Sequence, residues 1–337
     1  MTLPKILVIT PVRHITGVPE VLEATGQVTY MDDPTPEEVI AAIGKYDALY
    51  TNPNKSKVFI GPEVIDAAKN LKVICTASTG TNHIDKPYAA EKGLPILALT
   101  EEREVINRIS STAELAFALT MAGLRHVVRS HNAVLTGEWD YTRYIGRQMN
   151  CLTIGVIGYG RLGTLYARYC QAFGSRVMVY DPYKTVDREG LEQVKDLSVL
   201  LRESDVIAIH VHVTAETLGM MNAACFAQMK KDVTLVNTSR GDIVNESDLV
   251  AFMRANPQVR VATDVLADEV RNRLASPLLQ YAQQSEQVII TPHIGGMTRE
   301  AQEIAYGHAA FKLKNFFIDM RMKYDNTSKR KPPHTSV

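Results

Sequence analysis

The stretch LTIGVIGYGRLGTLYARYCQAF, residues 152–173, decides the fold of this chain. Its apolar first part predicts a buried strand, and its second part predicts a helix. Between the two, Gly158, Gly160 and Gly163 form the pattern G-x-G-x-x-G. In this setting the first glycine allows a tight turn, the second lets the backbone approach a pyrophosphate, and the third lets the helix pack on the strand. The stretch therefore predicts a dinucleotide-binding site at the amino end of the helix.

An acidic residue ends the next predicted strand, RVMVYD, residues 176–181. Asp181 follows the glycine loop at a spacing of about 20 residues, where a carboxylate accepts hydrogen bonds from the adenosine ribose. The same charge repels the 2′-phosphate of NADP. The sequence therefore predicts NAD as the cofactor.

Apolar runs recur along the whole chain and predict parallel strands. In the second half they are LTIGVI (152–157), RVMVYD (176–181), DVIAIHV (205–211), VTLVN (233–237), RVATDV (260–265) and QVIIT (287–291). In the first third they are KILVI (5–9), DALYT (47–51), KVICTA (72–77) and PILAL (95–99). The runs are apolar without alternation, as expected for strands covered on both faces, and helical segments separate them. We expect an α/β fold with two doubly wound parallel-sheet domains.

A helical stretch from Thr298 to about Met322 follows the last predicted strand, and we expect it to return to the N-terminal domain. This gives a discontinuous, flavodoxin-like substrate domain, residues 1–100 plus 298–337, and an inserted Rossmann NAD-binding domain, residues 101–297. The inserted domain contains a largely apolar helical stretch from Ser111 to Thr136. A helix that apolar is usually buried, so we expect a twofold homodimer built largely on it.

The composition of the 337 residues, 45% hydrophobic and 22% charged, is typical of a globular protein. The 37 basic residues balance 37 acidic ones, which argues against nucleic acid as a partner. Apolar stretches end well before 18 residues, so we expect no membrane span, and the N-terminus does not resemble a signal peptide. Four widely spaced cysteines predict free thiols in the cytoplasm. About 40 residues follow His293, and we expect them to hold no regulatory domain and to end in a solvated basic tail.

Three ionisable residues directly follow later strands. Arg240 follows the run at 233–237, Glu269 follows 260–265, and His293 follows 287–291. Ligands bind outside the carboxyl ends of strands in such sheets, so we expect the three side chains to meet there. An arginine fork holds the carboxylate of a 2-keto acid, a histidine delivers a proton to its carbonyl oxygen, and a carboxylate stabilises the imidazolium.

These motifs resemble the D-isomer-specific 2-hydroxyacid dehydrogenase family over nearly the whole chain. NTSRG (237–241) resembles the segment with the substrate-binding arginine, and TPHIGG (291–296) resembles the catalytic histidine motif. Asp264-Val265 with Glu269 resembles the segment whose glutamate partners the histidine. TGTNHID (79–85) resembles the substrate loop, which implies that the backbone N–H groups of Thr79 and Gly80 receive the substrate carboxylate.

The resemblance also implies a set of cofactor contacts along the inserted domain. They are Thr112, Gly158, Gly160, Arg161, Leu162, Gly163, Asp181, His210, Val211, Thr217, Thr238, Asp264, Gly295 and Gly296. The implied catalytic set is Arg240, Glu269 and His293, and the implied substrate contacts are Thr79, Gly80, Arg240 and His293.

The chain departs from the family pattern near the expected nicotinamide pocket. Val270 replaces a proline after Glu269, His212 replaces the proline of a His-x-Pro motif, and Met297 stands where a smaller residue is common. His210 and His212 share a strand face, but no third ligand accompanies them, so we expect no metal. Two further assignments stay open. Lys55 and Lys57 either bind a substrate phosphate or are solvated, and Trp139 either reaches a neighbouring subunit's site or anchors its own loop.

The sequence therefore predicts an NAD-dependent enzyme that interconverts a small 2-keto acid and its D-2-hydroxy acid. A non-enzymatic alternative is an NAD(H)-sensing interaction protein, like the corepressors that share this fold. Formate dehydrogenase is a rival among enzymes, but its relatives place glutamine where Glu269 stands. The sequence leaves open which 2-hydroxy acid is used and in which direction the reaction runs.

Overall fold

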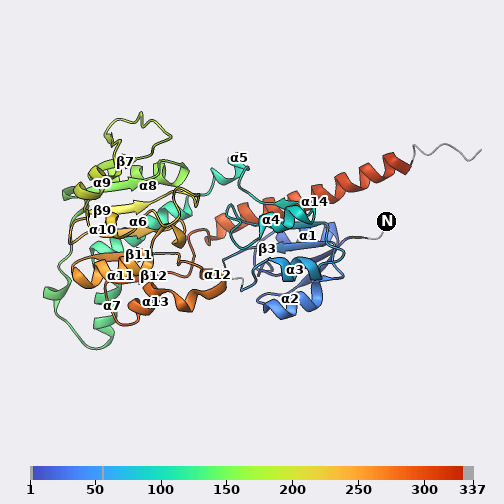
Figure 1. The fold of residues 1–337 in the computed structure, drawn as a ribbon, viewed down its shortest axis with the longest axis horizontal. Helices are drawn as coiled ribbons and strands as arrows, with labels where there is room; N and C mark the ends of the chain where they lie inside the picture. The colour runs from blue at the N-terminus through green and yellow to red at the C-terminus, as the bar shows by residue number, and fades with distance from the viewer. Residues whose placement is uncertain (1–2, 55–56, 329–337) are drawn as a thin grey trace, which may run out of the picture. The chain divides into compact units, whose positions relative to one another are not determined.

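The computed structural model describes residues 3–54 and 57–328, with side chains up to residue 323, and it divides into two compact units (Figure 1). The first unit comprises Met1–Ile109 and Arg299–Val337, and the second comprises Ser110–Thr298. Lys55 and the end of the basic tail lie outside the described residues. No helix in the described part of the chain is long and apolar enough to cross a membrane.

The first unit contains a five-stranded parallel sheet in the order β2-β1-β3-β4-β5, which is the flavodoxin-like order. Its strands are β1 (Lys5–Val8), β2 (Gln27–Tyr30), β3 (Ala48–Thr51), β4 (Val73–Thr76) and β5 (Ile96–Leu97). Its helices are α1 (Val18–Thr25), α2 (Pro36–Ile43), α3 (Pro62–Ala67), α4 (Lys86–Glu91), α5 (Arg103–Ile106) and α14 (Arg299–Ser328).

Neighbouring residues of the central strands bury opposite faces of this sheet. On β3, Leu49 joins a core cluster that includes residues of α2 and α3. Tyr50 points to the other face, where its hydroxyl donates to the Tyr306 carbonyl of α14 at 2.8 Å. The Cys75 thiol of β4 donates to the Ala309 carbonyl at 3.3 Å. The returning helix α14 therefore completes one face of the sheet.

The domain boundary differs from the prediction, because residues 101–109 group with the first unit. Lys312 of α14 explains this placement: its ammonium group donates to the Ala98 carbonyl at 2.8 Å and to Glu102 Oε1 at 2.5 Å. His308 Nε2 lies 3.1 Å from Glu102 Oε2. These contacts attach the segment that carries α5 to α14.

The second unit contains a seven-stranded parallel sheet in the order β12-β11-β10-β9-β6-β7-β8. Its strands are β6 (Thr153–Ile157), β7 (Arg176–Tyr180), β8 (Leu191–Gln193), β9 (Val206–Ile209), β10 (Thr234–Asn237), β11 (Arg260–Thr263) and β12 (Val288–Ile290). From β8 onward the order is that of the doubly wound Rossmann sheet, extended by one strand. The predicted fold class is confirmed.

The helices of the second unit include six of more than four residues and several short turns. The longer ones are α6 (Ser111–Leu124), α7 (Val127–Leu135), α8 (Arg161–Ala172), α9 (Leu197–Glu203), α11 (Glu246–Ala255) and α13 (Pro277–Ala282). The short ones are α10 (Ala223–Phe226), α12 (Glu269–Asn272) and the 3₁₀ turns η1 (Tyr141–Tyr144), η2 (Met149–Cys151), η3 (Gly241–Ile243) and η4 (Arg273–Ala275).

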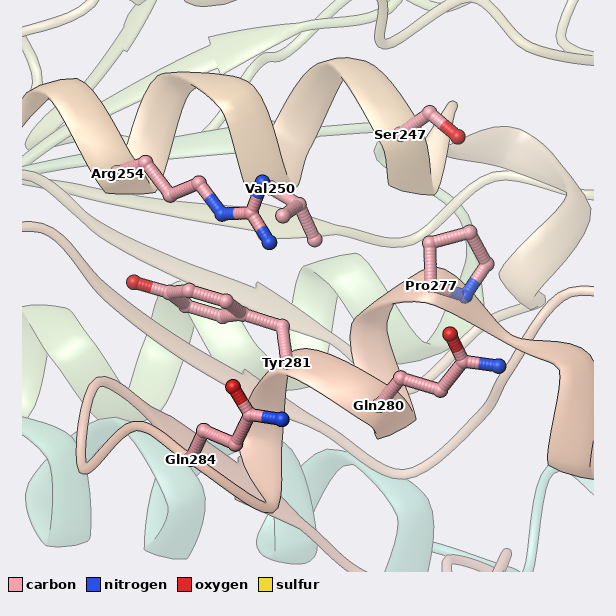
Figure 2. A pocket seen from close by; sticks show the side chains of 7 residues that line it. All are labelled: Ser247, Val250, Arg254, Pro277, Gln280, Tyr281 and Gln284. Carbon is pink, nitrogen blue, oxygen red and sulfur yellow. The ribbon is translucent and has the colours of Figure 1, made fainter.

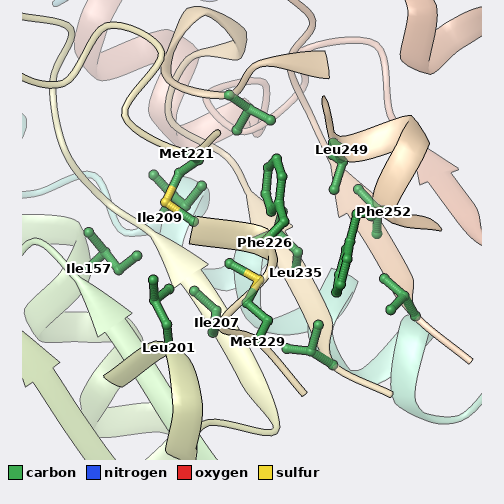
Figure 3. Close-up of a cluster of buried hydrophobic side chains, with 14 of the residues drawn as sticks. Ile157, Leu201, Ile207, Ile209, Met221, Phe226, Met229, Leu235, Leu249 and Phe252 are labelled. Atoms are coloured by element: carbon green, nitrogen blue, oxygen red, sulfur yellow. The ribbon is translucent and has the colours of Figure 1, made fainter. Parts of the chain in front are cut away.

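Strand β9 shows why its sequence is apolar without alternation. Val206 and Ala208 belong to the core cluster that contains residues of α6 and α8. Ile207 and Ile209 belong to the cluster on the other face, with Phe226 of α10 and residues of α11 (Figure 3). Because successive strand residues point to opposite faces, a sheet covered on both sides needs an apolar residue at every position.

The single apolar helix expected from Ser111 to Thr136 is wrong in extent. The chain breaks between α6 and α7 at His126, which adopts a left-handed conformation with φ 54°. Helix α6 buries Leu119 and Leu124 within its own unit. Its apolar circumference is thus explained by packing inside the subunit, between α8 and the strands β10 and β11.

Candidate active site

The glycine loop after β6 has the geometry of a tight strand–helix turn. Gly158 has φ +93°, and a Cβ there would lie 2.6 Å from the His210 carbonyl oxygen. A Cβ at Gly163 would lie 2.0 Å from the Gly158 carbonyl oxygen. A side chain at Gly158 would clash with the loop after β9, and one at Gly163 would force α8 away from the end of β6.

Gly160 is different, because nothing in the protein requires a glycine there. Its φ is −77°, and a Cβ would meet no protein atom within 4 Å. It is the N-cap of α8, and no side chain caps this helix. The glycine therefore leaves space at the amino end of α8, which is what a pyrophosphate needs. Arg161 and Leu162 form the first turn of the same helix.

Asp181 lies directly beside this loop. Its Oδ2 accepts from the Tyr159 N–H at 2.8 Å, and its Oδ1 accepts from the Tyr183 N–H at 2.9 Å. Each carboxylate oxygen has further lone pairs that can accept from ribose hydroxyls. The loop, the helix end and the carboxylate together fit a dinucleotide.

The loop after β9 contributes His210, Val211 and Thr217. The His210 ring packs 4.9 Å from the Tyr166 ring of α8, and neither of its nitrogens has a hydrogen-bond partner in the described structure. Burial lowers the pKa of His210 to about 4, so the ring is neutral at pH 7. The Thr217 hydroxyl donates to the His212 carbonyl at 2.5 Å and closes this turn.

Within the described residues, no group of three or more His, Cys, Asp or Glu is arranged to hold a metal ion.

The structure brings His293 and Glu269 into direct contact. His293 Nδ1 lies 2.5 Å from Glu269 Oε1, and both side chains are less than one-fifth exposed. His293 has a left-handed backbone with φ 54°, and its N–H donates to the Thr291 carbonyl at 2.9 Å. Glu269 opens α12, and its Oε2 accepts from the Leu266 N–H at 3.2 Å. Because Nδ1 is bonded to Glu269, a proton transfer by this ring would use Nε2.

Charge and burial act on Glu269 in opposite directions. Burial raises the pKa of this carboxyl, but the hydrogen bond and charge of His293, the Leu266 N–H and the charge of Arg240 together hold it below its usual value. Glu269 is therefore ionised at neutral pH.

Asp264 anchors the turn that presents His293. Its Oδ1 accepts from the Thr291 hydroxyl at 2.5 Å and the Ile294 N–H at 2.8 Å, and its Oδ2 accepts from the Gly295 N–H at 2.7 Å. Burial raises the pKa of Asp264, against these hydrogen bonds and the charge of His293. The sequence resemblance gave Asp264 only a cofactor contact. Its anchoring role was missed.

The predicted cofactor residue Thr112 lies next to Gly295, in the turn that Asp264 anchors. A Cβ at Gly295 would lie 3.1 Å from both Asp264 Oδ2 and Thr112 Cγ2. Gly296 is open, since a Cβ there would meet no atom within 4 Å. Thr238 is buried in the neighbouring turn, and its hydroxyl has no partner in the described structure.

Arg240 lies at the end of β10, on a turn that touches the Glu269 segment. A Cβ at Gly241 would lie 2.0 Å from the Leu266 carbonyl carbon, so the two turns meet backbone to backbone. The Arg240 Nη1 donates to the Ser239 carbonyl at 2.6 Å. Burial lowers the pKa of Arg240, and the charges of Glu269 and Asp242 oppose this effect. The second unit therefore gathers a cation, a carboxylate and an imidazole at the carboxyl ends of β10, β11 and β12.

The predicted substrate loop lies in the first unit, after β4. A chain of side-chain hydrogen bonds fixes it: His83 Nε2 lies 3.1 Å from Thr76 Oγ1, which lies 2.8 Å from Ser78 Oγ. The Ser78 hydroxyl then donates to the Gly80 carbonyl at 2.7 Å, and the Thr100 hydroxyl donates to the Thr79 carbonyl at 2.7 Å. Both carbonyls are held, so the loop has a defined backbone. Sequence analysis missed this chain, and the buried His83 inside the motif was the available signal.

The open assignments of Lys57 and Trp139 receive partial answers. Lys57 forms an exposed ion pair with Asp33 at 3.1 Å, so its charge already has a partner. Trp139 is 90% exposed and does not anchor its own loop.

Two cavities of the second unit lie apart from all these residues. One, of about 330 Å³, lies between α11 and α13, where the Arg254 guanidinium stacks 5.6 Å from the Tyr281 ring centre (Figure 2). The other, of about 240 Å³, lies at the break between α6 and α7 and is lined by His126, Arg129 and Arg260 among others. Neither contains a predicted site residue.

Comparison with known proteins assigns the family. Residues 117–295 match the sequence profile described as D-isomer specific 2-hydroxyacid dehydrogenase, NAD binding domain. The chain is 36% identical over 270 residues to D-3-phosphoglycerate dehydrogenase of Archaeoglobus fulgidus, covering 79% of this chain and 48% of that protein. It is 33% identical over 271 residues to hydroxypyruvate reductase of Thermotoga maritima, covering 79% and 83%. The chain spans about half the length of the curated phosphoglycerate dehydrogenases it matches.

A solved structure agrees with these matches. D-lactate dehydrogenase of Aquifex aeolicus, crystallised with NAD and lactic acid, superimposes with a TM-score of 0.76 at 28% identity, covering 94% of this chain and 96% of that one. With the glycine loop, the Asp181 carboxylate and the two sheet orders already described, these matches confirm the family resemblance. The chain belongs to the D-isomer specific 2-hydroxyacid dehydrogenase family, and its second unit contains that family's NAD-binding domain.

Proposed function

We propose that this protein is a 2-keto acid reductase that uses NADH to form a D-2-hydroxy acid, and that also catalyses the reverse oxidation. The observation that carries the proposal is the 2.5 Å contact between His293 Nδ1 and Glu269 Oε1 beside Arg240. A dinucleotide-sensing protein needs no buried acid–base pair of this kind. Reduction of a keto acid needs one, because the carbonyl oxygen must gain a proton as carbon gains hydride.

The catalytic side chains have separate tasks in this proposal. Bound NADH supplies the hydride. His293 donates its Nε2 proton to the carbonyl oxygen, and Glu269 holds the ring through Nδ1 and stabilises its protonated form. Arg240 stays charged and binds the substrate carboxylate through its planar fork. We assign the second set of carboxylate donors to the backbone N–H groups of Thr79 and Gly80, whose loop is fixed by Ser78 and Thr100.

The same residues can catalyse the oxidation of the hydroxy acid if His293 starts in its neutral form. Neutral His293 accepts the hydroxyl proton while the hydroxylated carbon loses hydride. Reduction therefore requires the imidazolium, and oxidation requires the neutral ring. Glu269 favours reduction toward higher pH because its charge stabilises the imidazolium.

The substrate itself is the open part of this proposal. The relatives' names include phosphoglycerate, hydroxypyruvate and lactate enzymes, so a panel must span those side chains. We expect NADH oxidation with at least one of pyruvate, hydroxypyruvate, glyoxylate, phosphohydroxypyruvate or a phosphonate-bearing keto acid. The His293→Gln variant serves as the matched control. NADH binding without turnover on every member of the panel would reject the enzyme in favour of a dinucleotide-sensing protein.

A further inference from the structure

A buried glutamate outside the proposed catalytic set holds the segment that carries Glu269. Glu246 is the first residue of α11, and its side chain lies in the interior with only 5% of the residue exposed. Its Oε1 accepts from the Ala267 N–H at 2.8 Å. Its Oε2 accepts from the Ser276 hydroxyl at 2.6 Å and from the Leu278 N–H at 3.5 Å. A buried carboxylate is costly unless it is hydrogen-bonded, and here both oxygens are.

The donors that Glu246 binds lie at the two ends of one segment. Ala267 is two residues before Glu269, while Ser276 is the N-cap of α13. Between them the chain passes through α12 and η4, which bury no residue. The Leu274 side chain there is 75% exposed. The segment therefore has little packing of its own, and one carboxylate clamps it at both ends.

The other side of the clamp is the Arg240 turn. Gly241 meets the backbone of Leu266 and Ala267 so closely that no side chain fits between them. Ala267 is thus held from one side by Gly241 and from the other by Glu246. We propose that Glu246 is a positioning residue that sets Glu269 against His293, in an inference that rests on the proposed role of that pair.

The proposal predicts a change in how His293 titrates when Glu246 is removed. The charged groups that act on the pair are Glu269 and Asp264 toward His293, Arg240 toward Glu269, and Asp242 toward Arg240. If Glu269 moves away, the imidazolium loses its nearest negative charge. The titration midpoint of His293 then moves acidward, by about half a unit to one unit.

The test compares Glu246→Ala with Asp248→Ala in the full-length protein. Asp248 is a matched control, because it lies in the same first turn and its carboxylate also accepts a backbone N–H, from Ala223 at 3.0 Å. Both variants lose one charge and one helix-terminal acceptor. Only Glu246→Ala should shift the His293 midpoint, measured by NMR with His293→Gln for assignment. Only Glu246→Ala should move the falling limb of kcat/KM for keto-acid reduction, with kcat lowered about tenfold.

Two further variants keep the test decisive. Glu246→Gln retains an acceptor for the Ala267 N–H and can donate to the Ser276 hydroxyl, so it should rescue most of the shift. In Glu246→Ala combined with Glu269→Gln, the midpoint should equal that of Glu269→Gln alone, because both act through one charge. If Glu246→Ala does not fold, Ser276→Ala, which removes one donor, takes its place and should give a smaller shift of the same sign.

An unchanged titration midpoint of His293 in folded Glu246→Ala would overturn the proposal. If Glu246→Ala does not fold, an unchanged midpoint in Ser276→Ala would overturn it. The NMR measurement needs no substrate. A failure of the proposed enzyme activity is therefore distinguishable from a failure of the positioning role.

Discussion

At the scale of single residues, His293 owes its orientation to three backbone and side-chain constraints. Its left-handed φ of 54° is uncommon for a residue other than glycine, and the surrounding turn is held by Asp264. Glu269 then fixes the ring through Nδ1. The imidazole is thus held in one orientation, and Glu269, its hydrogen-bond partner, is the first residue to test.

Replacing Glu269 by Gln removes the negative charge but keeps the shape and a hydrogen-bonding group. Because reduction uses protonated His293, the falling limb of kcat/KM against pH should shift acidward by about one unit or more. His293→Gln should instead lower reduction about a hundredfold or more at every pH. Steady-state kinetics over a pH series measures both effects. A falling limb that stays at the wild-type pH would mean that Glu269 does not tune His293.

Arg240→Lys tests the carboxylate fork. An ammonium group keeps the charge but cannot make two parallel hydrogen bonds to a carboxylate. KM for the keto acid should therefore rise about tenfold or more, while kcat falls less. Equal KM values for the two proteins would remove Arg240 from the substrate site.

Asp181→Ala tests cofactor choice. The wild type should prefer NADH because this carboxylate accepts from the ribose and repels a 2′-phosphate. In the variant, kcat/KM with NADH should fall, so the ratio of kcat/KM with NADH to kcat/KM with NADPH should move closer to one. Kinetics with NADH and NADPH measures the ratio, and a wild type that uses NADPH equally well would contradict the assignment.

At the scale of elements, the glycine loop offers a matched pair of substitutions. Gly163→Ala forces a Cβ to within 2.0 Å of a carbonyl oxygen and should lower the free energy of unfolding by about 1–3 kcal/mol. Gly160→Ala meets no protein atom and should change stability by less than about 0.5 kcal/mol. Its new methyl group should nevertheless weaken NADH binding by about tenfold or more, measured by calorimetry. Unchanged affinity in Gly160→Ala would show that the pyrophosphate does not lie there.

A second element-level prediction concerns the amino ends of the strands, where Asp205 joins three segments. Burial raises the pKa of Asp205, but the Thr153 N–H at 2.8 Å, Lys230 and Arg147 hold it below its usual value. A lowered folded pKa adds stability above the unfolded value of about 3.9, and this stability is lost as the pH falls below it. Asp205→Asn keeps an acceptor for the Thr153 N–H but removes the charge, so it should cost about 0.5–1 kcal/mol at pH 7; the cost is modest because both cations are more than one-third exposed.

Urea unfolding of both proteins over a pH series measures this contribution. The difference between wild type and Asp205→Asn should shrink as the pH falls below about 4. A difference that does not depend on pH would assign the effect to packing and not to the charge.

How far the sequence predicts the structure depends on the kind of element. Apolar buried strands such as β6 and β9 were placed within a residue or two, because their burial on both faces leaves a continuous apolar run. The edge strands β2 and β8 were missed, because each exposes part of its residues and lacks such a run. The break between α6 and α7 was missed as well. It depends on a left-handed turn at His126. Histidine is enriched in this conformation, but few histidines adopt it, so the residue type alone does not mark the break.

The candidate site divides in the same way. Arg240, Glu269 and His293 follow strands whose carboxyl ends meet, so topology alone brings them to one edge. Asp264 and Glu246 act through hydrogen bonds to residues 21 to 32 positions away in the chain, and such bonds depend on the final packing. The sequence alone does not show that a carboxylate will be buried, because its hydrogen-bond donors lie on other segments of the chain.

At the scale of the whole molecule, the homodimer remains a prediction, but the structure changes which surface we expect to form its interface. The apolar residues exposed in the second unit are most frequent from α7 to the end of η1. Leu135 at the end of α7, Tyr141 at the start of η1 and Ile145 just after η1 are each at least 71% exposed. Exposed apolar patches of this kind mark interaction surfaces. We now expect the twofold homodimer to use this region in place of the apolar side chains of α6.

Light scattering at micromolar concentration should give twice the 37.4 kDa mass of one chain. Leu135→Glu combined with Ile145→Glu should shift the protein toward the monomer, because two charges would be buried without partners. Leu274→Glu is the control, since Leu274 is 75% exposed in η4, outside this region. A wild-type protein with the mass of a monomer would refute the dimer.

The discontinuous first unit also sets an order of events during synthesis. Domains commonly fold from the amino end as they leave the ribosome. Here the first 109 residues emerge without α14, whose carbonyl groups receive Tyr50 and Cys75, while residues 110–298 form a complete sheet of their own. The later-made unit can thus reach its native state before the earlier one. Nascent chains stalled after residue 298 should resist protease from residue 110 onward and remain sensitive before it.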